Sequence, residues 1–250
     1  MGGQIVAGRN AVRELLHAGR RPVREIFFAE GIDAAPILEE IASLAARAGV
    51  PIRTVPRSKI DRLAETEAPQ GVVARAAPIP EADLTVLATS RSGQPAPFLV
   101  ALDGVTDPHN LGAIIRSAEA AGATGVVLTR HRAAHVTPTV TKAAAGAIEH
   151  IPIAVVPGLP TALQELQGRG VWTVGLAGDS PLSVFDLPVA DRPVCVVLGA
   201  EGAGMSRLVR QRCEIVVSIP RIGRTESLNV AAAAAVTCFE IARRRLADSP

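Results

Sequence analysis

The sequence predicts an α/β fold in which a small N-terminal α/β domain precedes a larger domain built on a mostly parallel sheet. Apolar runs alternate with helical patterns along the chain, and a proline-rich segment interrupts them at residues 77–97. The runs beyond that segment are continuous rather than alternating, which is typical of parallel strands covered on both faces. A chain of 250 residues is long enough for two such units.

The first unit is expected to span residues 1–76. Helical patterns at residues 8–18, 35–48 and 58–64 alternate with three apolar runs expected to be strands, VREIFFA, PIRTVP and GVVARAA. In residues 77–97, four prolines stand among small and polar residues, a composition more typical of a linker than of a packed element. The second unit then covers residues 98–250.

Five apolar runs are expected to form the sheet of the second unit: FLVALD, GVVLT, VWTVGLA, VCVVLGA and EIVVSIP. A turn and a helix follow the first run, with Asn110 as a candidate N-cap. The longest helix is expected at residues 227–246, with Ser227 as a candidate N-cap. Its start, VAAAAA, has little side-chain bulk and permits close approach of another helix or another subunit.

The composition is that of a globular protein, with 48% hydrophobic residues, 20% charged residues and a net charge of +2. No apolar run approaches the ~18 residues that a transmembrane helix needs, and the N-terminus lacks the apolar core of a signal peptide. A cytoplasmic location without membrane contact is therefore expected. The three cysteines show no CxxC spacing and are expected to be core thiols. His131 and His135 have the i, i+4 spacing of metal ligands but lack a third ligand, so no metal site is expected.

Positive charge gathers late in the chain. Five arginines and a single acid, Glu214, fall between residues 207 and 224, and arginine suits bidentate recognition of phosphate. Aromatic residues make up only 2% of the chain, so RNA binding by rows of stacked aromatic rings is not expected.

Three loops that follow apolar runs carry unusual residues, at the place where parallel sheets bind ligands. DPHNLGAIIRSAEAAG holds Asn110 and Arg116, LGAEGAGMS holds Glu201 among glycines, and IPRIGRTESLNVAAAA holds Ser227 and Asn229. The glycine loop is neither a Walker loop nor a dinucleotide fingerprint. Taken singly, each loop has a structural explanation: a solvated arginine, a glycine turn or a helix cap.

Together, in this order and spacing, the three loops resemble the signature motifs of the SpoU (TrmH) branch of the SPOUT RNA 2'-O-ribose methyltransferases. The segments GRNAVRELL and VTKAAAGAIEHIPI make the chain more similar to the rRNA-methylating, RlmB-like group than to the tRNA group. The resemblance covers nearly the whole chain. It implies a ribosomal-protein-like RNA-binding domain at residues 1–76, a catalytic SPOUT domain with a deep trefoil knot at residues 98–250, and a homodimer. The implied activity is S-adenosylmethionine-dependent 2'-O-methylation of a guanosine in large-subunit (23S) rRNA.

The resemblance also implies roles for single residues. The family's catalytic positions fall on Asn110, Arg116, Glu201, Ser227 and Asn229, and the backbone around three further residues would hold the cofactor, namely Gly199, Ile219 and Leu228. The family commonly has Ile-Pro-Met where this chain has Ile-Pro-Arg, ending at Arg221. That arginine either changes the lining of the cofactor site or contacts RNA.

Two roles are open for Arg116. As a general base it would take the proton of the ribose hydroxyl, although an arginine side chain, with an ordinary pKa above about 12, is seldom neutral. As an anchor it would hold the neighbouring phosphate and stabilise the developing alkoxide. Methylation of a tRNA guanosine or of an rRNA adenosine remains an alternative, as does a non-catalytic RNA-binding assembly factor. A dinucleotide-dependent oxidoreductase is disfavoured because the glycine fingerprint is missing.

Overall fold

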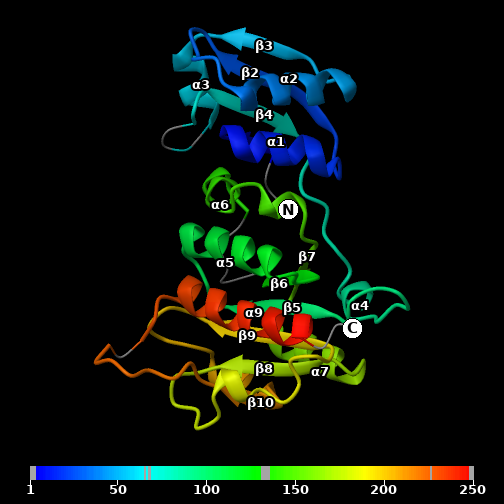
Figure 1. The fold of residues 1–250 in the computed structure, drawn as a ribbon, viewed down its shortest axis with the longest axis vertical. Coiled ribbons are helices and arrows are strands. Elements are labelled where there is room, and N and C mark those ends of the chain that lie inside the picture. The colour runs from blue at the N-terminus through cyan, green and yellow to red at the C-terminus, as the bar shows by residue number, and fades with distance from the viewer. Residues whose placement is uncertain (1–3, 65, 67–68, 131–135, 226, 248–250) are drawn as a thin grey trace.

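Two sheets, each covered by helices on both faces, follow one another along the long axis of the molecule (Figure 1). The structure is a computed structural model, and it describes residues 4–64, 66, 69–130, 136–225 and 227–247. His131 and His135 lie outside the described residues. Within the described part of the chain, no helix has both the length and the hydropathy to cross a membrane.

The N-terminal sheet has the strand order β1-β4-β2-β3. Its strands are β1 (Ile5–Ala7), β2 (Val23–Ala29), β3 (Ile52–Val55) and β4 (Val72–Ala76). Strands β2 and β3 pair in parallel, whereas β4 is antiparallel to both β1 and β2. Helices α1 (Arg9–Ala18) and α2 (Pro36–Arg47) bury apolar side chains against one face of this sheet, and α3 (Arg57–Ala64) covers the other.

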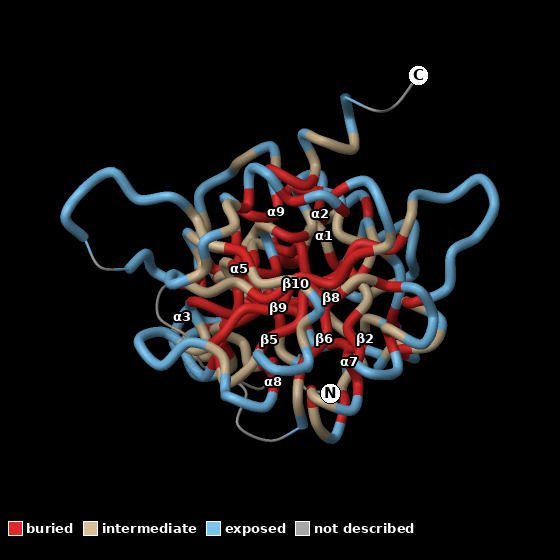
Figure 2. Tube along the Cα trace, turned by 90° about the horizontal axis from the view of Figure 1, so that it is seen from below, coloured by how far each residue is buried: buried red, intermediate tan, exposed pale blue. Residues whose placement is uncertain are grey.

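The second sheet has six parallel strands in the order β10-β8-β9-β5-β6-β7. They are β5 (Phe98–Asp103), β6 (Gly125–Thr129), β7 (Ile153–Val156), β8 (Trp172–Leu176), β9 (Val194–Gly199) and β10 (Ile215–Val217). The expectation of a parallel sheet is confirmed. Its central strands are buried on both faces, as the tube in Figure 2 shows, which explains why their sequences are continuously apolar.

Helices α5 (Pro108–Ala120) and α9 (Val230–Ala247) cover one face of the second sheet, and α7 (Leu159–Gly168) and α8 (Arg207–Arg212) cover the other. A shorter helix, α6 (Pro138–Ala143), packs on α5 because Gly112 has no side chain. A Cβ at Gly112 would lie 2.4 Å from that of Ala143. This glycine, in the middle of the first motif, therefore has a packing role.

Two helix caps differ from those expected. Asp107, not Asn110, caps α5, and its carboxylate accepts a hydrogen bond from the backbone N–H of His109 at 3.0 Å. Helix α9 begins at Val230 rather than at residue 227, because the side-chain oxygen of Asn229 accepts hydrogen bonds from the N–H groups of the first turn. Asn110 and Ser227 are thus not needed as caps.

The segment 77–97 contains a short helix, α4 (Leu84–Leu87), and packs on the second sheet at several points. Ile79, Leu84 and Ala88 are buried, and Glu81 makes a parallel bridge to Ile153. The apolar residues between the prolines hold this segment against the second sheet. The prolines alone do not predict this packing.

A buried ion pair joins the two units. Arg21, just before β2, donates hydrogen bonds of 2.9 and 2.5 Å to the two carboxylate oxygens of Glu149, and both side chains are 2% exposed. Glu149 belongs to a 3₁₀ helix, η1 (Ala147–Glu149), which follows α6. Arg21 also donates to the carbonyl of Ala77 at 2.6 Å. The pair therefore holds the N-terminal unit, the segment after it and the second unit together.

Candidate active site

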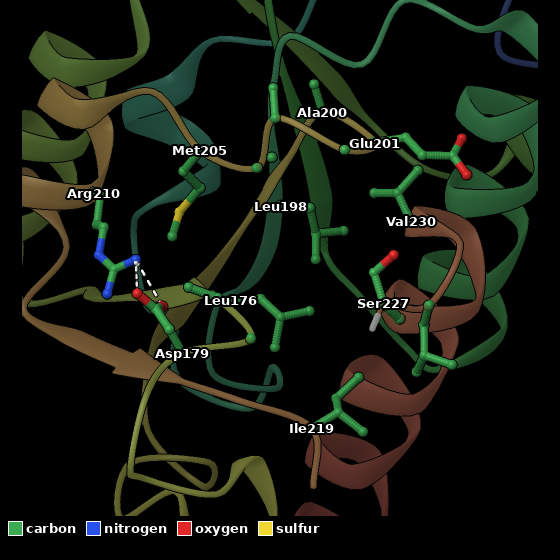
Figure 3. Close-up of a pocket in the computed structure, with 18 of the residues that line it drawn as sticks. Leu176, Asp179, Leu198, Ala200, Glu201, Met205, Arg210, Ile219, Ser227 and Val230 are labelled. Carbon is green, nitrogen blue, oxygen red and sulfur yellow. Dashed lines mark hydrogen bonds and ion pairs between the residues drawn. The ribbon is translucent and has the colours of Figure 1, made fainter. Parts of the chain in front are cut away.

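The carboxyl ends of β8 and β9 open into a pocket of about 480 Å³ (Figure 3). The second and third sequence motifs line it from opposite sides, because β9 leads into the glycine loop and β10 leads into the segment before α9. Five of the residues expected at the site are among its lining: Gly199, Glu201, Ile219, Ser227 and Leu228.

Gly199 ends β9 where the glycine loop turns back on itself. Ala200 and Gly204 form an antiparallel bridge with two backbone hydrogen bonds of 3.0 and 2.8 Å. A Cβ added at Gly199 would lie 2.0 Å from the backbone carbon of Gly204, a distance that no side-chain adjustment relieves. Only glycine at this position therefore lets the loop keep its shape. The loop forms one wall of the pocket.

The substitution Gly199→Ala is accordingly expected to weaken binding of S-adenosylhomocysteine by more than ~100-fold, since the loop must move by the size of a methyl group. Isothermal titration calorimetry measures this. Gly223→Ala is the matched control, because a Cβ there meets nothing within 4 Å, its φ is not positive, and the residue does not line the pocket. Equal affinities for Gly199→Ala and the wild type would contradict the close approach.

Three residues from the three motifs meet in one hydrogen-bonded cluster at the edge of this pocket. The amide nitrogen of Asn110 donates to Glu201 at 3.1 Å, and the amide nitrogen of Asn229 donates to Asn110 at 3.0 Å and to Glu201 at 3.4 Å. The oxygen of Asn229 is committed to the cap of α9, at 2.9 Å from the N–H of Ala231. The helix start thus fixes which end of this amide faces Glu201.

Arg116 does not join this cluster. It is exposed on α5 and lines a different pocket, toward α1. Residues six apart on an α-helix are about 120° apart around its axis, so Asn110 and Arg116 cannot share a face. Asn110 and Arg116 therefore do not meet within a single chain.

The rim of the pocket contains a carboxylate, Asp179, that the sequence did not single out. Asp179, just beyond β8, accepts a hydrogen bond of 2.8 Å from Arg210 of α8, and this bond lowers the pKa of the carboxyl group. Arg221 donates to the carbonyl of Gly178 at 3.1 Å, so the arginine that departs from the family pattern crosses toward the loop after β8. The position of Gly178 and Asp179 at the end of an expected strand is the signal that could have found them.

The pocket suits a cofactor with a flat apolar part and a polar end. Figure 3 shows the apolar side chains of Leu176, Leu198 and Ile219, and the oxygens of Glu201 and Ser227 at the side toward the cluster. Leu228 also lines the pocket. The glycine-lined wall brings backbone close to whatever occupies the space. The described residues contain no group of three or more histidine, cysteine or acidic side chains arranged to hold a metal ion.

Two family models match the sequence, the SpoU rRNA Methylase family over residues 97–239 and the RNA 2'-O ribose methyltransferase substrate-binding domain over residues 5–82. The chain belongs to the SpoU rRNA methylase family. The resemblance inferred from the three motifs is thereby confirmed, and the chain is an RNA methyltransferase of the SpoU (TrmH) type.

Relatives of this SpoU family member match along most of its length. It is 43% identical, over 97% of its length and 77% of the relative's, to an uncharacterized tRNA/rRNA methyltransferase of Mycobacterium ulcerans. It is 39% identical to the 23S rRNA (guanosine-2'-O-)-methyltransferase RlmB of Pseudomonas putida, with 96% of each chain covered. Among solved structures, the SpoU methyltransferase AviRb from Streptomyces viridochromogenes, in complex with the cofactor AdoMet, superposes with a TM-score of 0.80 at 26% identity. That superposition covers 97% of this chain and 90% of AviRb.

Proposed function

We propose that this SpoU methyltransferase transfers a methyl group from S-adenosylmethionine to the 2'-hydroxyl of a guanosine in 23S rRNA. The observation that supports this most directly is the cluster of Asn110, Glu201 and Asn229 at the edge of the pocket. The guanosine and the 23S rRNA are suggested by the similarity to RlmB, which extends over 96% of both chains.

The cofactor fits the pocket beside this cluster. The backbone around Gly199, Ile219 and Leu228 would hold it, against the apolar side chains of Leu176 and Leu198. When bound, S-adenosylmethionine supplies an electrophilic methyl group on a sulfonium, so the protein needs to supply orientation, charge stabilisation and a place for one proton.

The residues of the cluster suit orientation and hydrogen bonding. Asn110 is 8% exposed, and its amide is held between Glu201 and Asn229, so it presents a fixed donor and acceptor. Glu201 accepts from both asparagines and has further acceptor capacity for a ligand hydroxyl. Ser227 is exposed on the pocket wall, and we expect it to contact the same ligand.

The experiment that tests the function is incubation of the protein with labelled S-adenosylmethionine and unmodified 23S rRNA, 16S rRNA or bulk tRNA. The product is mapped by nuclease digestion and mass spectrometry. We expect 2'-O-methylguanosine in 23S rRNA. A methyl group in tRNA, or on an rRNA adenosine, would replace the proposed substrate, and no incorporation into any RNA would leave a non-catalytic RNA-binding protein.

We also propose that the protein acts as a homodimer. Helix α9 exposes an apolar stripe at helical spacing, formed by Ala232, Val236, Phe239 and Leu246, and Phe239 and Leu246 are 51% and 75% exposed. Such a stripe is what a second copy would cover through a symmetric contact. We also propose that the catalytic unit contains the trefoil knot that the resemblance implies. The N-terminal unit is proposed to bind the RNA substrate.

A homodimer would also explain the position of Arg116, if this arginine reaches the cofactor pocket of the partner. Two inactive variants, Arg116→Ala and Glu201→Ala, are then expected to complement each other, because one active site in each mixed dimer is intact. Refolding an equal mixture should restore about a quarter of the wild-type rate. Rates no higher than those of the separate variants would place Arg116 and Glu201 in the same chain's site.

A further inference from the structure

The five arginines between residues 207 and 224 are all exposed, and four of them lie at or next to the cofactor pocket. Arg210 and Arg221 line the pocket itself. Arg207 stands three positions before Arg210 on α8 and therefore on the same face of that helix. Arg224 follows Arg221 in the exposed segment before α9. We call these four residues the arginine rim.

The two halves of the arginine rim meet at the loop that follows β8. Arg210 reaches this loop from α8 and donates to the carboxylate of Asp179 at 2.8 Å. Arg221 reaches it from the segment after β10 and donates to the carbonyl of Gly178 at 3.1 Å. Because Gly178 and Asp179 are neighbours in the chain, two guanidinium groups from different parts of the sequence lie close together.

The arginine rim stands at the carboxyl ends of the strands. Helix α8 begins at this edge of the sheet, because the backbone N–H of Ser206 donates a hydrogen bond of 2.7 Å to the carboxylate of Asp103, the last residue of β5. Figure 3 shows Arg210 and Glu201 on opposite sides of the pocket. The rim and the hydrogen-bonded cluster that contains Glu201 therefore face each other across the cofactor pocket.

The positive charge of the arginine rim is only partly compensated. Asp179 pairs with Arg210, but Arg207 and Arg224 have no hydrogen bond or ion pair with any residue that the structure describes. Arg207 is also the first residue of α8, where a positive charge opposes the helix dipole. Since these charges do not serve the fold, they are available for a ligand.

The ligand that fits the arginine rim is an anion with repeated charges. Guanidinium groups bind phosphate through two parallel hydrogen bonds, and the proposed function brings the phosphates of an RNA strand to this side of the sheet. The carboxylate of the cofactor is a single charge inside the pocket. It would account for Arg210 or Arg221, but not for Arg207 and Arg224, which do not line the pocket.

We propose that the arginine rim binds backbone phosphates of the RNA substrate, on the side of the cofactor pocket opposite the hydrogen-bonded cluster. The proposal rests on the proposed function, in that RNA is the substrate. It gives the catalytic unit its own contact with the RNA backbone, in addition to the N-terminal unit. Arg221, where the family commonly has methionine, adds to this contact a charge that the family pattern lacks.

The test is filter binding of labelled, transcribed 23S rRNA and of bulk tRNA to the full-length protein saturated with S-adenosylhomocysteine, over a range of salt concentrations. The variant is Arg207→Ala with Arg224→Ala. We expect it to bind either RNA about 20-fold more weakly at about 0.1 M salt, because each exposed ion pair contributes up to about fivefold. The slope of log affinity against log salt should become shallower by about 1.5, since two phosphate contacts are lost.

The matched control removes two exposed arginines from the opposite edge of the same sheet. Arg192 and Arg212 precede β9 and β10, so Arg192→Ala with Arg212→Ala changes the net charge equally and should leave RNA affinity and salt slope unchanged. A control variant as weak as the rim variant would show an effect of net charge alone and overturn the proposal.

A lysine variant tests whether the contact depends on charge. Arg207→Lys with Arg224→Lys keeps both positive charges and should keep the salt slope of the wild type, because that slope counts neutralised phosphates. The shallower slope of the alanine variant in this lysine variant would contradict a phosphate contact.

Calorimetry and methyl incorporation separate this proposal from the proposed function. The alanine variant should bind S-adenosylhomocysteine as the wild type does, and an equal loss of cofactor and RNA affinity would show that the two arginines act through the cofactor pocket. Methyl incorporation by the wild type, with unchanged RNA affinity and salt slope in the alanine variant, would refute the arginine rim alone. Weaker RNA binding with a shallower slope, without methyl incorporation into any RNA, would support the rim and refute the methyltransferase function.

Discussion

Replacing Arg116 by alanine is expected to lower the rate of methyl transfer to RNA by about 10²–10⁴-fold, the loss that follows removal of a general base or of a group stabilising a developing oxyanion. Binding of S-adenosylhomocysteine should stay close to the wild-type level, because Arg116 does not line the cofactor pocket of its own chain and both of its proposed roles concern the RNA. Initial rates with labelled cofactor and calorimetry measure the two quantities. Arg47→Ala, at the end of α2, is the matched control.

The variant Arg116→Lys distinguishes the two roles of this arginine. A lysine acting as base gains activity as the pH rises toward its ordinary pKa of about 10.4, because it must be neutral to accept a proton. A lysine acting as a phosphate anchor keeps activity at neutral pH and loses it over the same range as its charge disappears. Wild-type activity in both Arg116→Ala and Arg116→Lys would exclude either role.

Removing the buried carboxylate of Glu149 is expected to produce the largest loss of stability. Glu149→Ala removes the carboxylate that accepts two hydrogen bonds from the buried guanidinium of Arg21, and breaking one side of a buried pair costs about 3–5 kcal/mol in the free energy of unfolding. Urea denaturation followed by circular dichroism measures this loss.

The double variant Arg21→Met with Glu149→Leu is the control for this stability effect. Replacing both charged groups by apolar ones of similar size leaves no buried unpaired charge, and such exchanges are close to neutral or stabilising. A loss below about 1 kcal/mol in the free energy of unfolding of Glu149→Ala would show that water reaches the contact between the two units. A double variant as unstable as the single one would show that Arg21 is needed for its bond to Ala77.

Most strands of the second sheet could be predicted from the sequence, because a strand that is buried on both faces has a continuous apolar run. The runs FLVALD and GVVLT coincide with β5 and β6 at both ends. Strand β1, at three residues, and strand β7, at four, were not predicted, since so short an apolar stretch does not distinguish a strand from a buried helix. Helix α4 was not predicted, because prolines are frequent in the segment around it.

The sequence by itself determined the family, the parallel sheet and the residue types of the three motifs, because these depend on local pattern and on motif order along the chain. Only the tertiary structure decided which of those residues meet. Asn110, Glu201 and Asn229 converge because β5 and β9 end, and α9 begins, at one edge of the sheet, whereas Arg116 turns with its helix toward α1. Contacts between residues about a hundred positions apart depend on how helices and strands pack, and no local pattern encodes that packing.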